Sequence, residues 1–166
     1  NTQLRCSRES IAVVLEKLLL LPQGGTAVGS GINAHKRFSK EFSKELAKLT
    51  GFKTQPSKDF FRNLSAQDLS VQLSGELKNL ATILLKISND LRWMNSGPLS
   101  GISEIELQAL QPGSSIMPGK VNPVIPEAVA MAAADVIGND VSITVAAQSG
   151  NLSLIHISEP TRPIAI

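Results

Sequence analysis

The feature that most constrains the fold is a long stripe of aliphatic side chains in the middle of the chain. Large apolar residues recur there at intervals of four and three, namely Leu69, Leu73, Leu77, Leu80, Leu84, Ile87, Leu91 and Met94. This spacing places them on one face of an α-helix, as in helices that pack in a bundle. The stripe ends at Ser96-Gly97-Pro98, so we predict a helix over residues 66–95.

A helix of that length requires long neighbours. At ~1.5 Å per residue, about thirty residues make a rod of about 45 Å, which a chain of 166 residues accommodates only beside other long helices. The fold class is therefore predicted to be all-α, a long-helix bundle without strands. Further helices are expected near 8–49, disturbed at 24–31, and near 125–149. Gly51 should end the first of these, residues 52–64 should form a connection, and Ser65 should cap the next helix.

The last predicted helix has no polar face. Residues 127–147 are apolar nearly all round, and their large members include Val129, Met131, Val136, Ile137, Val141, Ile143 and Val145. Such a helix needs partners on every side. Three long helices cannot supply them, so the sequence predicts that the chain assembles into an oligomer.

Between the last two helices lies a loop that concentrates reactive side chains. The stretch 112–123 reads PGSSIMPGKVNP, and its glycines and prolines exclude a continuous helix or a central strand. Lys120 and Asn122 are two residues apart, so in an extended segment both side chains would point to the same face and could bind one carboxylate. A serine hydroxyl, as in Ser114, becomes a base only where N–H groups or a cation stabilise its alkoxide. The alternative interpretation is a connector with solvated polar residues.

Three segments resemble the fumarase/aspartase superfamily, and within it the class II fumarases. They are GSSIMPGKVNP in the loop, LPQGGTAVGSGIN at 21–33 and KISNDLRWMNSGP at 86–98. The resemblance implies that Ser114 abstracts a proton beside a carboxylate and that Lys120 and Asn122 bind and polarise that carboxylate. It also implies a substrate-binding role for Ser115 and a supporting role for Glu127, whose alternative role is that of an acid in the first turn of a helix.

The resemblance implies reversible hydration of fumarate to malate, without a cofactor or metal, by a homotetramer with a central bundle. Aspartate ammonia-lyase shares the loop and remains an alternative, as does a helical assembly domain that has lost catalysis. The expected location is the cytoplasm, or the mitochondrial matrix in a eukaryote. The family builds each site from three segments of three subunits, so this chain alone is expected to be inactive.

The resemblance spans roughly residues 18–151 and predicts the domain organisation. Residues 1–151 are expected to be part of the central helical domain, in a chain that does not begin with Met. Residues 152–166 depart from the family pattern and resemble a translated sequencing adapter, so we interpret them as a non-native tail.

Composition excludes several other classes of partner. The formal net charge of +2 comes without a basic patch, which argues against nucleic acid. The apolar run 11–21 is too short to cross a membrane. Cys6 is the single cysteine, and with His35 and His156 it makes no metal site. The glycines of 24–31 could cradle a phosphate, but no strand precedes them and no Gly-Lys-Ser/Thr follows, so this interpretation is weak.

Overall fold

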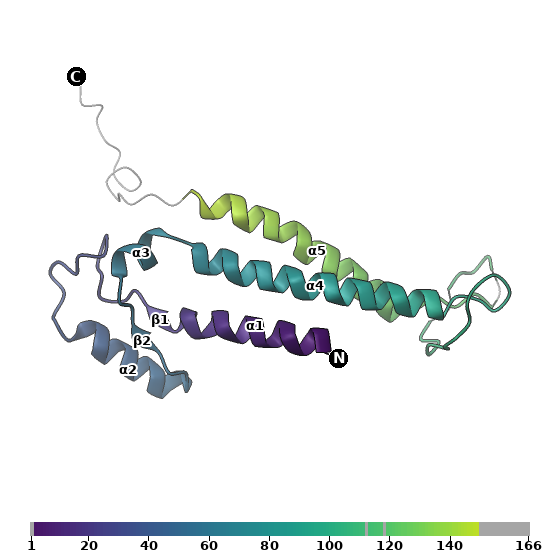
Figure 1. Cartoon of the computed structure of the whole chain (residues 1–166), viewed down its shortest axis with the longest axis horizontal. Helices are drawn as coiled ribbons and strands as arrows, with labels where there is room; N and C mark the ends of the chain where they lie inside the picture. Colours follow the sequence, from purple (N-terminus) through teal and green to yellow (C-terminus); the bar gives the residue numbers. More distant parts are fainter. Residues whose placement is uncertain (1, 112, 118, 150–166) are drawn as a thin grey trace, which may run out of the picture. The chain divides into compact units, whose positions relative to one another are not determined.

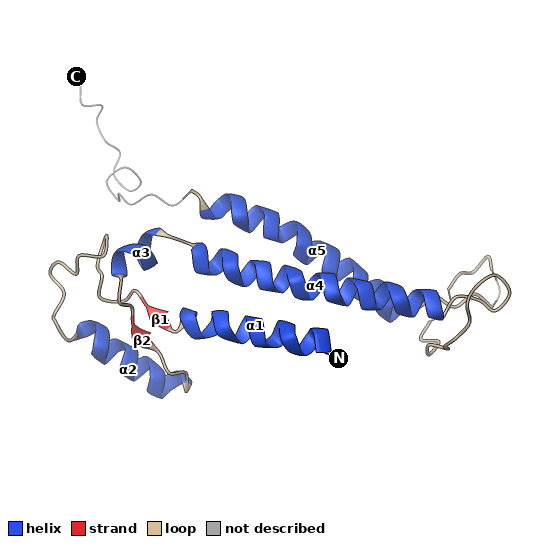
Figure 2. Ribbon diagram, viewed as in Figure 1, coloured by secondary structure: helices blue, strands red, loops and turns tan. Residues whose placement is uncertain are grey.

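The computed structural model describes residues 2–111, 113–117 and 119–149, so the predicted tail 152–166 lies outside the described residues. Helices dominate the described chain (Figures 1 and 2). The described residues form two compact units, of which the first comprises residues 2–8 and 75–141 and the second residues 9–74 and 142–149. The all-α prediction is confirmed, with corrections to individual elements.

The helix predicted near 8–49, with a disturbance at 24–31, is replaced in the structure by two separate helices. The structure has α1 (Thr2–Leu18) and α2 (Phe38–Thr50), separated by an irregular glycine-rich segment. Gly29 has φ of 114°, and a Cβ there would lie 2.5 Å from the backbone nitrogen of Phe61. The absence of a side chain at Gly29 therefore permits close packing against the chain around Phe61. The prediction for Gly51 is confirmed, because it ends α2 in the left-handed conformation with φ of 77°.

The prediction that the chain has no strand is also wrong. Two-residue strands, β1 (Leu20–Leu21) and β2 (Gln55–Pro56), pair in parallel. The backbone N–H groups of Gln55 and Ser57 donate to Leu19 and Leu21 at 2.9 and 2.8 Å. Pro56 lies between these two donors and has no N–H, so the pairing loses nothing at that position.

A short helix, α3 (Phe60–Ser65), occupies part of the predicted connection. Asp59 caps it by accepting a hydrogen bond from the Arg62 N–H at 3.0 Å. The sequence contains this signal, since an Asp directly before apolar residues is a typical N-cap. Ser65 is the last residue of α3 and not the cap of the following helix, so that prediction is wrong.

Helix α4 (Asp68–Met94) confirms the helix predicted from the aliphatic stripe. The stripe itself is only partly covered, and Leu77 remains 42% exposed. The buried residues of α4 are instead small and recur every seven residues, as Ser74, Ala81 and Ser88. The larger side chains on the stripe are therefore half-buried, apart from the exposed Leu77.

Helix α5 (Val124–Ala147) repeats this arrangement, with Pro126, Ala133 and Asp140 buried at seven-residue spacing. Lys78 of α4 donates to Asp140 at 2.5 Å, and residues around Leu91 and Pro126 line one common cavity. Within the first unit, α4 and α5 are therefore neighbours that run antiparallel.

Among the described helices, α5 is long and apolar enough to cross a membrane by length and composition. It nevertheless carries Glu127, Asp135 and Asp140. Carboxylates within a membrane span are costly, so this composition favours a helix packed in a protein bundle.

Candidate active site

The loop before α5 is closed at its base by its own backbone. The Gly113 N–H donates to the Lys120 carbonyl at 2.8 Å, and the Lys120 N–H donates to the Met117 carbonyl at 3.2 Å. A Cβ on Gly113 would lie 2.6 Å from the Lys120 carbonyl oxygen, so only glycine fits here without a shift. The described part of the loop contains no helix, as the sequence predicts.

Ser114 is half-buried within this closed loop. Its Oγ accepts a hydrogen bond from the Ile116 N–H at 3.1 Å. An N–H donor aimed at a hydroxyl oxygen would also stabilise an alkoxide at that position. The geometry is thus compatible with the role predicted for Ser114, whereas the neighbouring Ser115 is exposed.

The two predicted carboxylate ligands follow where the loop enters α5. Lys120 is exposed and Asn122 is half-buried. Neither side chain makes a hydrogen bond to another described residue, so both keep their donors for a ligand. The Asn122 carbonyl accepts from the Val124 N–H at 2.9 Å, which ties this residue to the start of the helix.

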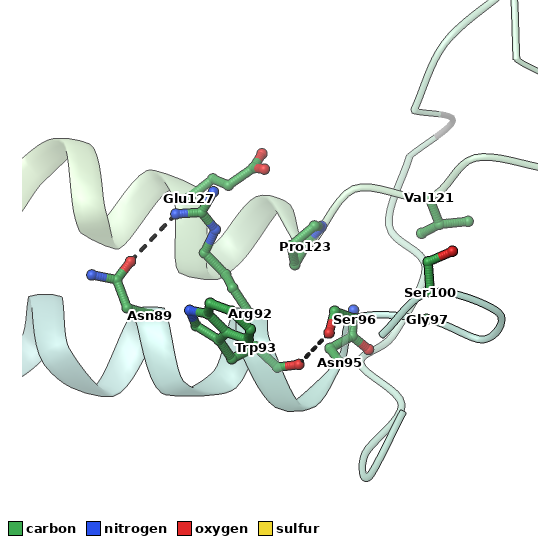
Figure 3. Close-up of a pocket in the computed structure, with 10 residues that line it drawn as sticks. All are labelled: Asn89, Arg92, Trp93, Asn95, Ser96, Gly97, Ser100, Val121, Pro123 and Glu127. Carbon is green, nitrogen blue, oxygen red and sulfur yellow. Dashed lines mark hydrogen bonds between the residues drawn. The ribbon is translucent and has the colours of Figure 1, made fainter. Parts of the chain in front are cut away.

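Beside the loop, the first unit contains an open pocket of about 500 Å³ (Figure 3). Glu127 is the only one of the five predicted site residues that lines it, although Val121 and Pro123, on either side of Asn122, also do. The described residues of the lining are Asn89, Arg92, Trp93, Asn95, Ser96, Gly97, Ser100, Val121, Pro123 and Glu127. The structure therefore brings Glu127 to the pocket and leaves Ser114, Ser115, Lys120 and Asn122 outside its lining.

Among the described residues that line this pocket, Arg92 and Glu127 are the charged ones. The Arg92 side chain extends from α4 toward α5, and its guanidinium donates to the Asn89 side-chain oxygen at 3.3 Å (Figure 3). Sequence reasoning assigned no site role to Asn89, Arg92 or Asn95. The sequence does contain a signal that could have identified them, because all three belong to the segment 86–98 that carries the family resemblance.

The floor of the pocket is built where the chain leaves α4. The Asn95 side-chain oxygen accepts from the Leu107 N–H at 2.8 Å. Ser96 Oγ donates to the Trp93 carbonyl at 2.5 Å and accepts from the Ile102 N–H at 3.1 Å. These bonds tie residues 95–107 to the end of α4 and hold the polar side chains of the lining in place.

The loop and the pocket offer several polar groups for chemistry. Two hydroxyls, an ammonium and a carboxamide lie on the loop, and a guanidinium and a carboxylate lie in the pocket beside carboxamides and hydroxyls. Within the described residues, no group of three or more His, Cys, Asp or Glu side chains could hold a metal ion. Among the residues that the structure describes, the pocket lining offers Arg92 as a cation and no second one for the other end of a dicarboxylate.

Comparison with known proteins extends these observations. The class II fumarate hydratase 2 of Pseudomonas aeruginosa is 63% identical over 152 residues, which are 92% of this chain and 33% of that protein. The class II fumarate hydratase of Xylella fastidiosa is 58% identical over 140 residues, 84% of this chain and 30% of that protein. The chain thus spans about a third of the length of these relatives.

Solved structures agree with this result. The class II fumarase of Schistosoma mansoni matches with a TM-score of 0.88 and 38% identity, over 92% of this chain and 35% of that one. A cobalt-bound fumarate lyase:delta crystallin of Brucella melitensis matches with a TM-score of 0.86 and 42% identity, over 91% and 33% of the two chains.

The family model described as "Lyase" matches residues 1–138. This match begins upstream of residue 18, where the sequence resemblance was expected to begin, and it includes the loop, the pocket and Glu127. This chain therefore belongs to the lyase family.

Proposed function

We propose that the protein to which this chain belongs is a class II fumarate hydratase, which adds water reversibly to fumarate and gives malate. The observation that carries the proposal is the similarity to relatives that bear this name at 46–63% identity. The loop with Ser114, Lys120 and Asn122 is the part of the chain that would contact substrate.

In the direction from malate, the first step removes a proton from the carbon beside a carboxylate. Ser114, as an alkoxide stabilised by the Ile116 N–H, takes this proton, and its electron pair moves into the carboxylate to give a doubly negative aci-carboxylate. Lys120 and Asn122 bind that carboxylate and offset its charge. The electron pair then returns to form the double bond, and the hydroxyl group takes a proton from an acid elsewhere in the protein and leaves as water.

The supporting role of Glu127 receives a physical basis from the pocket. Its carboxylate lines the same cavity as Arg92, close to the end of the loop (Figure 3). A carboxylate there would orient a water molecule or a cation beside the substrate. The groups that bind the second carboxylate of the substrate would come from parts of the protein outside this chain.

Aspartate ammonia-lyase is the nearest alternative, because ammonia elimination passes through the same kind of intermediate. The names of the relatives favour the hydratase. A helical assembly domain without catalysis is the alternative from another class. It is less favoured because the loop keeps its hydroxyl, ammonium and carboxamide together.

The whole protein is proposed to act as a homotetramer on a small dicarboxylate, without nucleic acid or membrane partners. Support for oligomerisation comes from α5, where Ile125, Met131 and Val141 are exposed although the helix is apolar nearly all round. We further propose a cytoplasmic location, or the mitochondrial matrix in a eukaryote.

The decisive experiment is Ser114→Ala in the full-length protein. Turnover with fumarate should fall by at least about a hundredfold, because a positioned proton-transfer group contributes typically 10²–10⁴-fold. The oligomer should persist, since Ser114 lies in a loop and contributes no core packing. Assays of malate formation and of molecular mass measure both quantities.

Lys120→Ala is the companion variant and should raise KM as well as lower turnover, because it removes a carboxylate ligand. Near-parental turnover in Ser114→Ala would place the base elsewhere. If the parental protein releases ammonia from aspartate and leaves malate unchanged, the site assignment would stand, but the reaction would be that of an aspartate ammonia-lyase.

A further inference from the structure

The apolar composition of helix α5 does little to fix its position along a neighbouring helix. Its exposed residues include large apolar side chains such as Met131 and Val141, and its buried residues include Ala133. In an amphipathic helix, the boundary between polar and apolar faces fixes the rotation. Because α5 has almost no polar face, hydrophobic burial alone does not fix its rotation or its axial position.

The buried residues of α4 and α5 do not fix that position either. Ala81 and Ser88 are buried on α4, and Pro126, Ala133 and Asp140 on α5, each set at seven-residue spacing. Sliding one helix by seven residues, about 10 Å, would again place small residues against small residues. Among these five, only Asp140 is charged.

Asp140 therefore distinguishes one register from the others. Its side chain is 7% exposed and accepts from the Lys78 ammonium at 2.5 Å, whereas the Lys78 side chain is 46% exposed. An ionised carboxylate taken out of water is costly unless a cation remains beside it. After a slide of seven residues, Lys78 would no longer reach Asp140, so the alternative registers lose this interaction.

The same register determines which residues of α4 and α5 lie level with each other at the candidate site. Thirteen residues separate Asp140 from Glu127 on α5, and thirteen residues beyond Lys78 on α4 is position 91. In antiparallel helices with equal rise per residue, Glu127 must then lie level with residues 91–92. Glu127 and Arg92 indeed line the same pocket.

We propose that Lys78 and Asp140 are positioning residues that select the register of α4 and α5 and thereby place Glu127 opposite Arg92. Single polar or charged pairs inside helical packing are the best attested devices for selecting register, often at some cost in stability. The activity readout of this inference rests on the proposed hydratase function, but its structural readout does not.

The test replaces the pair by apolar residues, Lys78→Met with Asp140→Leu, in the full-length protein. Nitroxide labels at Asn79 and Ala132, both exposed and on different helices, report the axial offset of α4 and α5. The labels are attached to cysteines introduced at these two positions, after the native cysteines have been replaced. Labelled subunits are then diluted with unlabelled protein. Unfolding temperature, kcat and KM are measured on the same variants without labels.

We expect the parent to show one label distance. The apolar variant should gain a second population, displaced by about 10 Å along the helix axis. Its unfolding temperature should stay at or above that of the parent, because apolar replacement of a buried pair is often neutral or stabilising. The kcat should fall by the fraction in the second population, while KM of the remaining sites stays unchanged.

The matched control is the exposed ion pair of Lys86 and Asp90 on α4, replaced by Lys86→Gln with Asp90→Asn. It should leave the label distance, kcat and KM unchanged. Lys78→Gln is the second test variant if the apolar pair does not fold, and it should also populate a second distance. A single unchanged distance in the folded variant overturns the inference, whatever the activity. A parent without fumarate hydration refutes the proposed function and leaves the distance test in force.

Discussion

At the scale of single residues, Gly113 illustrates how a residue without a side chain determines the shape of the site. Gly113→Ala would place a methyl group 2.6 Å from the Lys120 carbonyl oxygen. The loop must open at its base to admit it, at a cost of about 1–3 kcal/mol. In the full-length protein we expect kcat/KM for fumarate to fall at least about tenfold, measured by steady-state kinetics.

The control for this substitution is Gly75→Ala in α4, where a Cβ meets no atom within 4 Å. Alanine there should leave kcat/KM unchanged and raise helix stability by about 0.5–1 kcal/mol. If both alanine variants kept parental kinetics, the closed base of the loop would have no role in catalysis.

Asp68 supports a prediction about pH. The Arg62 guanidinium donates a hydrogen bond to Asp68 and thereby lowers the pKa of that carboxyl. A carboxyl with a lowered pKa in the folded state stabilises the fold above its unfolded pKa, and this contribution is lost as pH falls through the folded pKa. Asp68→Asn should therefore lower the unfolding temperature slightly at neutral pH and have no effect in strong acid.

Thermal unfolding at several pH values measures this difference, and Asp135→Asn on α5 serves as the comparison. The effect should be small, because Arg62 and Asp68 are both exposed and solvent weakens such pairs. An Asp68→Asn variant with the same deficit at every pH would show that the carboxylate acts through packing and not through its charge.

At the scale of elements, the long periodic helices were predictable and the short elements were not. α4 and α5 follow the predicted ranges within two residues at each end. Their signal is a pattern repeated over many turns. β1 and β2 depend instead on hydrogen bonds between residues about 35 apart, such as that of Gln55 to Leu19, which no local pattern records.

The same distinction applies to the candidate site, whose loop was predictable from the sequence and whose pocket was not. The loop residues were found because the motif is contiguous in sequence. The pocket joins Asn89 and Arg92 of α4 to Glu127 of α5, and this proximity depends on the antiparallel packing of the two helices. Sequence reasoning identified both segments but could not place one against the other.

The loop 113–122 should be the internal segment with the least protection from amide hydrogen exchange. In the described part of the loop, the backbone N–H groups of Gly113 and Lys120 donate to backbone carbonyls, and that of Ile116 donates to the Ser114 hydroxyl. Exposed loops with few such bonds open at low free energy. Exchange measured by mass spectrometry on the chain should show the loop exchanging faster than α4 and α5, and equal protection would contradict this.

At the scale of the whole molecule, the described chain buries few large apolar side chains. Its buried hydrophobic residues are Val14, Ala81 and Ala133, two of which are alanines. Burial of apolar area is the main stabilising term in folding, at about 25 cal/mol per Å². Burial of large apolar side chains within the described residues therefore supplies little of this term.

Residues 1–166 expressed alone should form aggregates or a loose oligomer in place of a tetramer. They should also show no measurable hydration of fumarate. Exposed apolar residues on α5 promote association, and the loss of several members of a catalytic unit removes most of its rate. Light scattering and a malate assay test the two statements separately. A well-defined tetramer with activity would overturn both.

The hydrogen bond between Gly113 and Lys120 has a thermodynamic consequence for ligand binding. It turns the loop into a ring whose ends are already joined at 2.8 Å before any ligand arrives. The entropy of bringing those ends together is thus lost during folding and is not lost again on binding. Ordering the loop over a substrate should then restrict only the residues inside the ring, so calorimetry of Gly113→Ala should show a less favourable binding entropy than the parent.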